Sequence, residues 1–159
     1  YPYVKYSDSS TLIAANSDSI KSFVKKTTID TKSDSVKDVW LRNSGVDILL
    51  SIDVVPNVGF CASFGNSDNT SEYSNVYFYN TDGGVNKSYQ FKERINSIKS
   101  VDNEFVLSSS TAVHLYGGKF TLKGEYTSLS DIQNVDFINS KKLFVQMLSR
   151  NMFVEFIPE

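Results

Sequence analysis

The sequence predicts an all-β fold of repeated four-stranded antiparallel meanders, and three observations support this prediction. Val, Ile, Thr and the aromatic residues, which favour strands, number 16, 10, 9 and 21, whereas there are only 4 Ala residues. Ser and Asn number 24 and 13, and Asp outnumbers Glu by 12 to 6, as is typical of a chain rich in turns. The third observation is an internal repeat of short apolar segments separated by polar turns. With 159 residues, the chain is long enough for one domain with a sizeable core.

The clearest repeat lies in the third quarter of the chain. Residues 95–101 lead to the Asp102-Asn103 turn, and residues 105–107 are then apolar at three successive positions, as in a strand buried on both faces. A second polar turn at residues 108–110 leads to a further expected strand within residues 111–116. This order of short strands and turns predicts one antiparallel meander.

The same template recurs in the other three quarters of the chain. Each copy has an apolar segment, a polar turn, a second apolar segment, another turn and a third apolar segment. The expected strands lie around Val4 and at residues 12–15 and 20–24 in the first copy, at 49–55, 60–64 and 76–79 in the second, and at 132–138, 143–145 and 152–156 in the last.

A fourth, outer strand is expected after each of the first three copies. Residues 119–126 alternate apolar and charged side chains, which is typical of a half-exposed edge strand. Residues 26–30 and 87–91 occupy the corresponding places after the first and second copies. Each complete copy is therefore predicted to be a four-stranded sheet.

The spacing of the copies fits the blade of a β-propeller. The equivalent points Leu12, Phe60, Phe105 and Leu143 are 48, 45 and 38 residues apart, close to the roughly 40–45 residues of a four-stranded blade. We expect a single propeller-like domain of about three and a half blades, with approximate repeats at residues 1–35, 36–91, 92–130 and 131–159.

These repeats resemble the WD-repeat superfamily of β-propellers across nearly the whole chain. The resemblance rests on the order Ile95-x-Ser97-Ile98, a turn, three apolar residues, a small polar turn and then Val113-x-Leu115-Tyr116. The resemblance implies a propeller fold and says little about the activity. The Trp-Asp and Gly-His dipeptides of that family are absent, and the single tryptophan, Trp40, is expected to fill a gap in the core. The narrower family of phosphoinositide-binding propellers carries a Phe-Arg-Arg-Gly motif, and this chain has no Arg-Arg pair.

The number of blades leaves three alternatives open. Closed propellers have about 4–8 blades, so three and a half blades would leave an incomplete ring with bare strand edges. Further blades could lie in residues beyond this sequence, or a partner could supply strands by addition to a sheet edge. The third alternative is a meander that closes into a β-sandwich or barrel.

No catalytic constellation is recognised in the sequence. The single histidine, His114, lies within an expected strand, where we interpret it as a residue that makes one hydrogen bond, and no Gly-x-Ser-x-Gly motif accompanies the serines. Most Asp residues lie in turns, which Asp favours for conformational reasons. The single cysteine, Cys61, is expected to be a buried small apolar residue. We therefore predict a protein that is not an enzyme and that has neither a metal site nor a cofactor.

The function expected from these observations is a non-catalytic scaffold that binds other proteins within an intracellular assembly, in the cytoplasm or nucleus. The formal net charge of −2 gives no general basic field for nucleic acid or membranes. A propeller that binds phosphoinositide or nucleic acid through lysine clusters is the alternative. The candidate partner-binding residues are Tyr73, Tyr77, Tyr79, Tyr89, Lys25, Lys26, Lys141 and Lys142.

Overall fold

In the computed structural model, which describes residues 2–27, 32–42, 47–68 and 73–157, fifteen strands form four antiparallel sheets. The first sheet comprises β1 (Tyr3–Tyr6), β2 (Thr11–Asn16), β3 (Ser19–Thr27) and β4 (Lys32–Leu41). The second comprises β5 (Asp47–Val55), β6 (Gly59–Asn66), β7 (Ser74–Tyr79) and β8 (Val85–Phe91). The third comprises β9 (Ser97–Val101), β10 (Glu104–Ser108), β11 (Ala112–Gly117) and β12 (Leu122–Thr127), and the fourth β13 (Ile132–Asn139), β14 (Lys142–Met147) and β15 (Asn151–Glu155).

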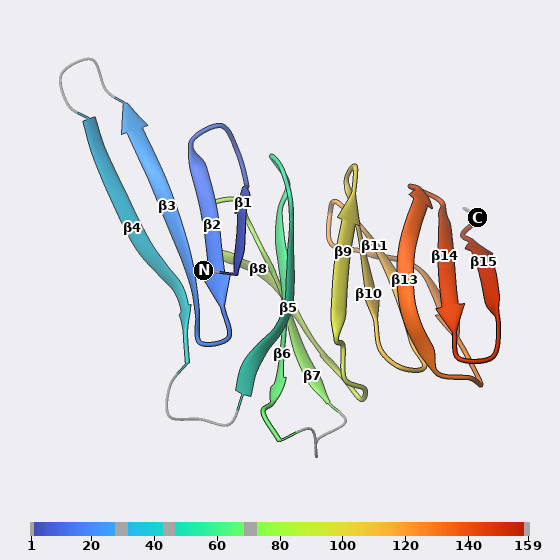
Figure 1. The fold of residues 1–159 in the computed structure, drawn as a ribbon. Coiled ribbons are helices and arrows are strands. Elements are labelled where there is room, and N and C mark those ends of the chain that lie inside the picture. The colour runs from blue at the N-terminus through green and yellow to red at the C-terminus, as the bar shows by residue number, and fades with distance from the viewer. Residues whose placement is uncertain (1, 28–31, 43–46, 69–72, 158–159) are drawn as a thin grey trace.

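The four sheets are successive blades of a propeller-like arrangement. Figure 1 shows them fanning out from the first strand of each sheet, β1, β5, β9 and β13, while β4 and β15 lie at opposite ends of the fan. Each sheet is a simple meander in which every strand pairs with the next one along the chain. The predicted all-β fold of repeated meanders is confirmed, and the described strands form separate sheets rather than one barrel.

The equivalence of the four copies is visible in the strand register. Leu12, Phe60, Phe105 and Leu143 lie at the same place on the second strand of their sheets, because each pairs with a residue of the first strand and a residue of the third. We call the line of partners through each of these residues a packing row. The rows are Tyr6–Leu12–Phe23–Val36, Val54–Phe60–Tyr79–Val85, Ser100–Phe105–Tyr116–Leu122 and Phe137–Leu143–Val154.

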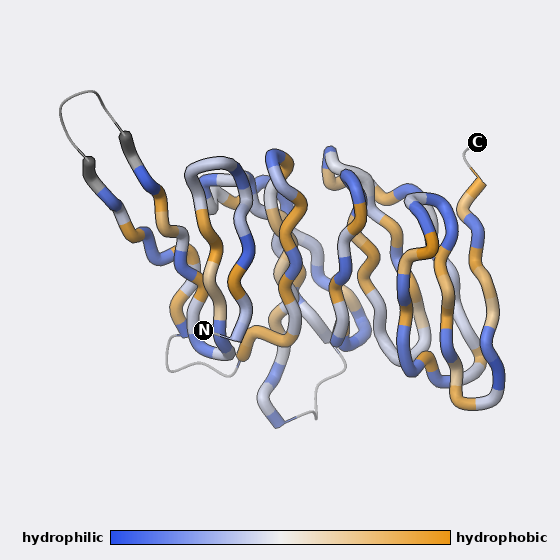
Figure 2. The backbone as a smooth tube through the Cα atoms, turned by 45° about the horizontal axis from the view of Figure 1, so that its top comes forward, coloured by the Kyte–Doolittle hydropathy of each residue, from blue (hydrophilic) through white to orange (hydrophobic). Residues whose placement is uncertain are grey.

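The core is divided into three clusters, one between each pair of consecutive sheets. Apolar positions recur along the strands of all four sheets (Figure 2), and cross-strand partners share a face. Phe60 of the second packing row packs toward the first sheet, Phe105 of the third toward the second sheet, and Leu143 of the fourth toward the third sheet. Each sheet is therefore stabilised chiefly by contacts with its neighbours.

Close approaches of the backbone explain several turn residues. Gly59 has a φ of +143°, and a Cβ atom there would lie 2.0 Å from the carbonyl oxygen of Tyr79. Asn57 and Asp102, in the first turns of the second and third sheets, have φ values of 62° and 51°, which Asn and Asp tolerate better than most residues. Phe120 is a bulky residue with a φ of 56°, and its ring is buried between the second and third sheets.

The outer strand of the first sheet lies later in the chain than expected. Residues 26–30 were expected to form it, but β3 continues through residue 27, and residues 28–30 lie outside the described residues. The outer strand is β4, so the expected repeat boundary between residues 35 and 36 falls inside a strand. The charged residues of β4 obscured this strand in the sequence. One of them, Asp38, has a partner on β3, because Lys21 Nζ lies 3.2 Å from Asp38 Oδ1. Trp40 belongs to this strand, and its ring lies 4.6 Å from that of Phe64 in the core.

Candidate protein-interaction site

Asp53 on β5 connects the first strands of three consecutive sheets. Its Oδ1 atom accepts hydrogen bonds from the hydroxyl of Tyr3 at 2.9 Å and from Nζ of Lys5 at 3.0 Å, both on β1. Its Oδ2 atom accepts a hydrogen bond of 2.6 Å from the hydroxyl of Ser100 on β9. Burial alone would raise the pKa of Asp53, but the hydrogen bonds from Ser100 and Lys5 outweigh it and lower the pKa below its ordinary value. The carboxylate of Asp53 is therefore ionised at neutral pH, and it links β5 to β1 and β9.

The first strands carry alternating charges at one equivalent position. Lys5, Asp53, Lys99 and Asp136 each pair with the residue that follows the packing-row residue on the second strand. We call these four residues the inner charge row. Lys99 forms an ion pair with Asp136 and donates a hydrogen bond of 3.0 Å to Oδ1 of Asn134. Opposite charges thus join the first sheet to the second and the third to the fourth.

The surroundings of His114 do not form a Ser-His-Asp triad. Nε2 of His114 lies 2.6 Å from Oε1 of Glu93, and the hydroxyl of Ser109 donates to Oε2 of the same carboxylate. The hydrogen bonds from His114 and Ser109 hold the pKa of Glu93 below its ordinary value despite partial burial. Because Glu93 separates the serine from the histidine, His114 is not placed to take a proton from Ser109. The three side chains instead connect the loop after β8 to β11 and to the turn between β10 and β11.

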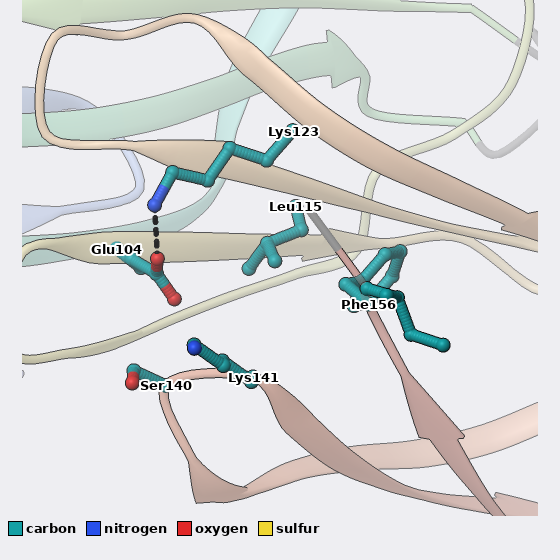
Figure 3. A pocket seen from close by; sticks show the side chains of 7 residues that line it. Glu104, Leu115, Lys123, Ser140, Lys141 and Phe156 are labelled. Carbon is teal, nitrogen blue, oxygen red and sulfur yellow. Dashed lines mark hydrogen bonds and ion pairs between the residues drawn. The ribbon is translucent and has the colours of Figure 1, made fainter. Parts of the chain in front are cut away.

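A pocket lies at the junction of the third and fourth sheets. Glu104, Leu115 and Lys123 of the third sheet line it, together with Ser140 and Lys141 in the β13–β14 turn and Phe156 and Ile157 after β15. Figure 3 shows these side chains converging from both sheets. The cavity volume is about 170 Å³, enough for part of one side chain. We call it the junction pocket.

Glu104 gives the junction pocket its chemical character. The residue is only 8% exposed, and its Oε1 atom forms an ion pair with Lys123. Its Oε2 atom is buried and has no hydrogen-bond partner among the described residues. A buried carboxylate oxygen without a donor costs about 1–3 kcal/mol or more. Glu104 therefore places a carboxylate with an unsatisfied acceptor oxygen in the wall of a pocket that is partly apolar.

The structure does not bring the four candidate tyrosines together on one exposed patch. Tyr79 is 3% exposed and stacks on Phe60 with ring centroids 4.5 Å apart, so its side chain belongs to the core. Tyr77 and Tyr73 are half-buried. Tyr89 is 37% exposed and packs on the opposite face of the second sheet, against the core between the second and third sheets.

The candidate lysines lie at opposite ends of the fan (Figure 1). Lys25 is exposed on β3 and pairs across the sheet with Asp34, while the side chain of Lys26 is outside the described part. Lys141 lines the junction pocket, and Nζ of Lys142 lies 5.3 Å from the ring centroid of Phe153. The lysine clusters therefore do not form one continuous basic surface, and only Lys141 belongs to the junction pocket.

Sequence reasoning missed Glu104 and Phe156 as site residues. The residues of the junction pocket are spread from position 104 to position 157, so no local motif marks it. One signal was present, because Glu104 is a charged residue at the start of a strand that is otherwise apolar at residues 105–107. A charged side chain in such a place is rarely buried without a partner.

The described residues contain no group of three or more His, Cys, Asp or Glu side chains that could hold a metal ion. They also contain no helix that is long and apolar enough to cross a membrane.

Comparisons with known proteins support the propeller-type fold. No protein-family model matches this sequence, and no curated protein matches it in a sequence search. Among solved structures, a chain of a mitotic checkpoint complex is 12% identical with a TM-score of 0.61, and the match covers 99% of this chain and 48% of that one. BBS1N in complex with ARL6DN is 10% identical with a TM-score of 0.56, covering 91% and 47%. Kluyvelomyces marxianus Hsv2 is 16% identical with a TM-score of 0.53, covering 98% and 48%.

These matches define the class of the protein at the level of its fold. The matched chains are propeller-type structures, and the WD-repeat resemblance is supported to that extent. This chain spans about half the length of each of the three matched chains. Two of them come from complexes with other proteins.

Proposed function

We propose that this chain is a non-catalytic protein-interaction module of an intracellular assembly, and that it binds a peptide segment of a partner in the junction pocket. Support at the level of the fold comes from propeller-type structures solved within protein complexes. The observation that carries the proposal is that Glu104, which lines a partly apolar pocket, has a buried Oε2 atom without a hydrogen-bond donor among the described residues.

The lining of the pocket indicates the chemistry of the bound side chain. Leu115 and Phe156 offer apolar contacts, so the side chain should have an apolar body. Lys123 and Lys141 line the same pocket, so the cationic group of an incoming side chain would be repelled. A neutral donor on an aromatic body, such as the hydroxyl of tyrosine or the indole N–H of tryptophan, fits both conditions and is common in the centres of protein interfaces.

Selection from a random peptide library against the purified protein tests this proposal. We expect the bound peptides to share a tyrosine or tryptophan, and the Glu104→Gln variant to bind them about tenfold more weakly, as loss of a charged hydrogen bond worth about 1.5 kcal/mol predicts. Asp102→Asn is the matched control, because it also removes one negative charge, lies two residues away and is exposed. Thermal melting of both variants checks that they remain folded.

Two results would contradict the proposal. One is a set of selected peptides with no shared aromatic donor, and the other is equal peptide binding by the Glu104→Gln variant and the native protein. Binding to anionic lipid vesicles or to DNA that falls steeply with salt, without any peptide binding, would favour the alternative function instead.

A further inference from the structure

The first sheet has one face on which no other described sheet packs, and we call such a face a free face. It is built like the faces that are buried between sheets elsewhere in the fold. Its packing row, Tyr6–Leu12–Phe23–Val36, corresponds to rows whose central residues are buried in the other three sheets. Phe60 and Phe105 are 0% exposed and Leu143 is 1% exposed, because each packs on the preceding sheet. No described sheet precedes the first one, and Tyr6 is 62% exposed. A hollow of about 390 Å³ lies over this row.

The last sheet also has a free face, which corresponds to the other side of an internal junction, the side on which the packing row of the next sheet packs. Phe144 and Phe153 lie side by side there, with ring centroids 5.8 Å apart, on the face that does not contact the third sheet. Phe153 is 60% exposed and Ile138 is 50% exposed. The two ends of the fan therefore present one face of each type that meets at every internal junction.

The alternation of positive and negative charge along the inner charge row is kept if a second copy of the chain follows the fourth sheet. Lys5 is positive, Asp53 negative, Lys99 positive and Asp136 negative, in the order of the four sheets. A second copy placed after the fourth sheet would set its Lys5 beside Asp136, so opposite charges would again be neighbours. A partner with an acid at that position would be repelled.

The arrangement of the sheets allows this closure. In Figure 1 the first and last sheets point away from each other, and their free faces lie on the same open side of the fan. The chain spans about half the length of the propeller-type chains that it matches. Two copies would give eight sheets, which lies within the range of known propellers, about 4–8 blades.

We propose that two copies of this chain close head to tail into one ring of eight sheets. In this dimer, the free face of the first sheet of each copy packs against the last sheet of the other. A two-fold axis makes the two contacts identical, so the assembly is closed and does not grow. Phe144 and Phe153 then fill the hollow over the packing row of the first sheet.

The mass of the protein in solution is the first test. Light scattering after size-exclusion chromatography should give twice the chain mass of 17.8 kDa. Tyr6→Glu and Phe153→Glu should each return the protein to a monomer, because each places a charge in both contacts. Val85→Glu is the matched control, because Val85 occupies the equivalent position on the outer strand of the second sheet, is 57% exposed and lies outside both contacts. This variant should remain dimeric.

Disulfide trapping tests the head-to-tail direction. Tyr6→Cys and Phe153→Cys variants, when mixed and oxidised, should form a covalent dimer, whereas each variant alone should not. Cys61 is buried and serves as the unreactive background. A native protein that is monomeric at every concentration would overturn the proposal, as would a dimer that survives both glutamate variants or a covalent dimer of the Tyr6→Cys variant alone.

Discussion

Nζ of Lys5 on β1 lies 3.0 Å from Oδ1 of Asp53 on β5, and this ion pair joins the first strand of the first sheet to the first strand of the second. The same carboxylate accepts hydrogen bonds from Tyr3 on β1 and Ser100 on β9, so the side chain of Asp53 links the first strands of three sheets. Replacing it should therefore affect the whole fan rather than one sheet.

Asp53→Asn should lower the free energy of unfolding by about 1–3 kcal/mol at neutral pH, because Lys5, Tyr3 and Ser100 lose a charged acceptor. The pKa of Asp53 is lowered in the folded protein, so its stabilising contribution is present above the unfolded value, about 3.9, and is lost as the pH falls through the folded value. Urea unfolding of both proteins from pH 7 to pH 2 should show the difference shrinking at acid pH. Asn in place of the exposed Asp131 should leave the curve unchanged. A difference between the Asp53→Asn variant and the native protein that stays constant as the pH falls below about 3.9 would contradict this prediction.

Gly59→Ala should be strongly destabilising. The added Cβ would lie 2.0 Å from the carbonyl oxygen of Tyr79 and 3.2 Å from the ring of Phe120, at a φ of +143° that L residues rarely adopt. We expect a loss of several kcal/mol, of the order seen for backbone strain combined with overpacking. Gly84→Ala is the control, because its nearest neighbour is a side-chain oxygen of Asp82 at 3.2 Å and its φ is not in the left-handed region. Equal melting temperatures for the two variants would show that β6 and β7 can separate without cost.

Phe120 combines unfavourable backbone geometry with favourable packing. Its φ is 56°, yet its side chain is 3% exposed and lies 5.0 Å from the ring of Phe78, measured between ring centroids. Phe120→Ala should cost about 3–5 kcal/mol by leaving a cavity. Phe120→Gly leaves an even larger space, but it removes roughly 1 kcal/mol of left-handed strain. We therefore expect the glycine variant to be the more stable of the two in urea, and the reverse order would rule out strain at this position.

The thiol of Cys61 should be unreactive in the folded protein. Burial raises the pKa of Cys61 well above its ordinary value, and the nearby charge of Asp53 adds to this effect. The thiolate, which is the reactive form, is therefore scarce at neutral pH. Alkylation followed by mass spectrometry should show labelling only as urea unfolds the chain, with the same midpoint as circular dichroism. Rapid labelling of the native protein would mean that the junction between the second and third sheets opens readily.

The repeat could be predicted from the sequence because each sheet is formed by one continuous segment. Leu12, Phe60, Phe105 and Leu143 mark equivalent places both in the sequence and in the strand register, since short apolar strands separated by polar turns leave a local pattern. The outer strand β4 was misplaced because its charged residues did not suggest a strand. The ion pair of Asp38 with Lys21 on β3 is a contact that no local pattern reveals.

The candidate site was less accessible to sequence reasoning. Tyr79 was a candidate partner-binding residue, but a tyrosine in a strand packs equally well in a core, and here it stacks on Phe60. Lys141 was a candidate because of its charge, and it lines the junction pocket. Glu104 and Phe156 reach the same pocket only because the third and fourth sheets pack together, and that proximity depends on the tertiary structure.

The meander topology has a consequence for how such a protein can change in length. Among the described strands none leaves its own sheet to complete another, so the backbone ladder of each sheet is self-contained. A duplication or deletion of one whole segment would therefore leave every remaining ladder intact and alter only the side-chain contacts at one junction. The number of units in a single polypeptide is then an adjustable quantity, and the alternation of Lys and Asp along the inner charge row favours changes that occur two units at a time.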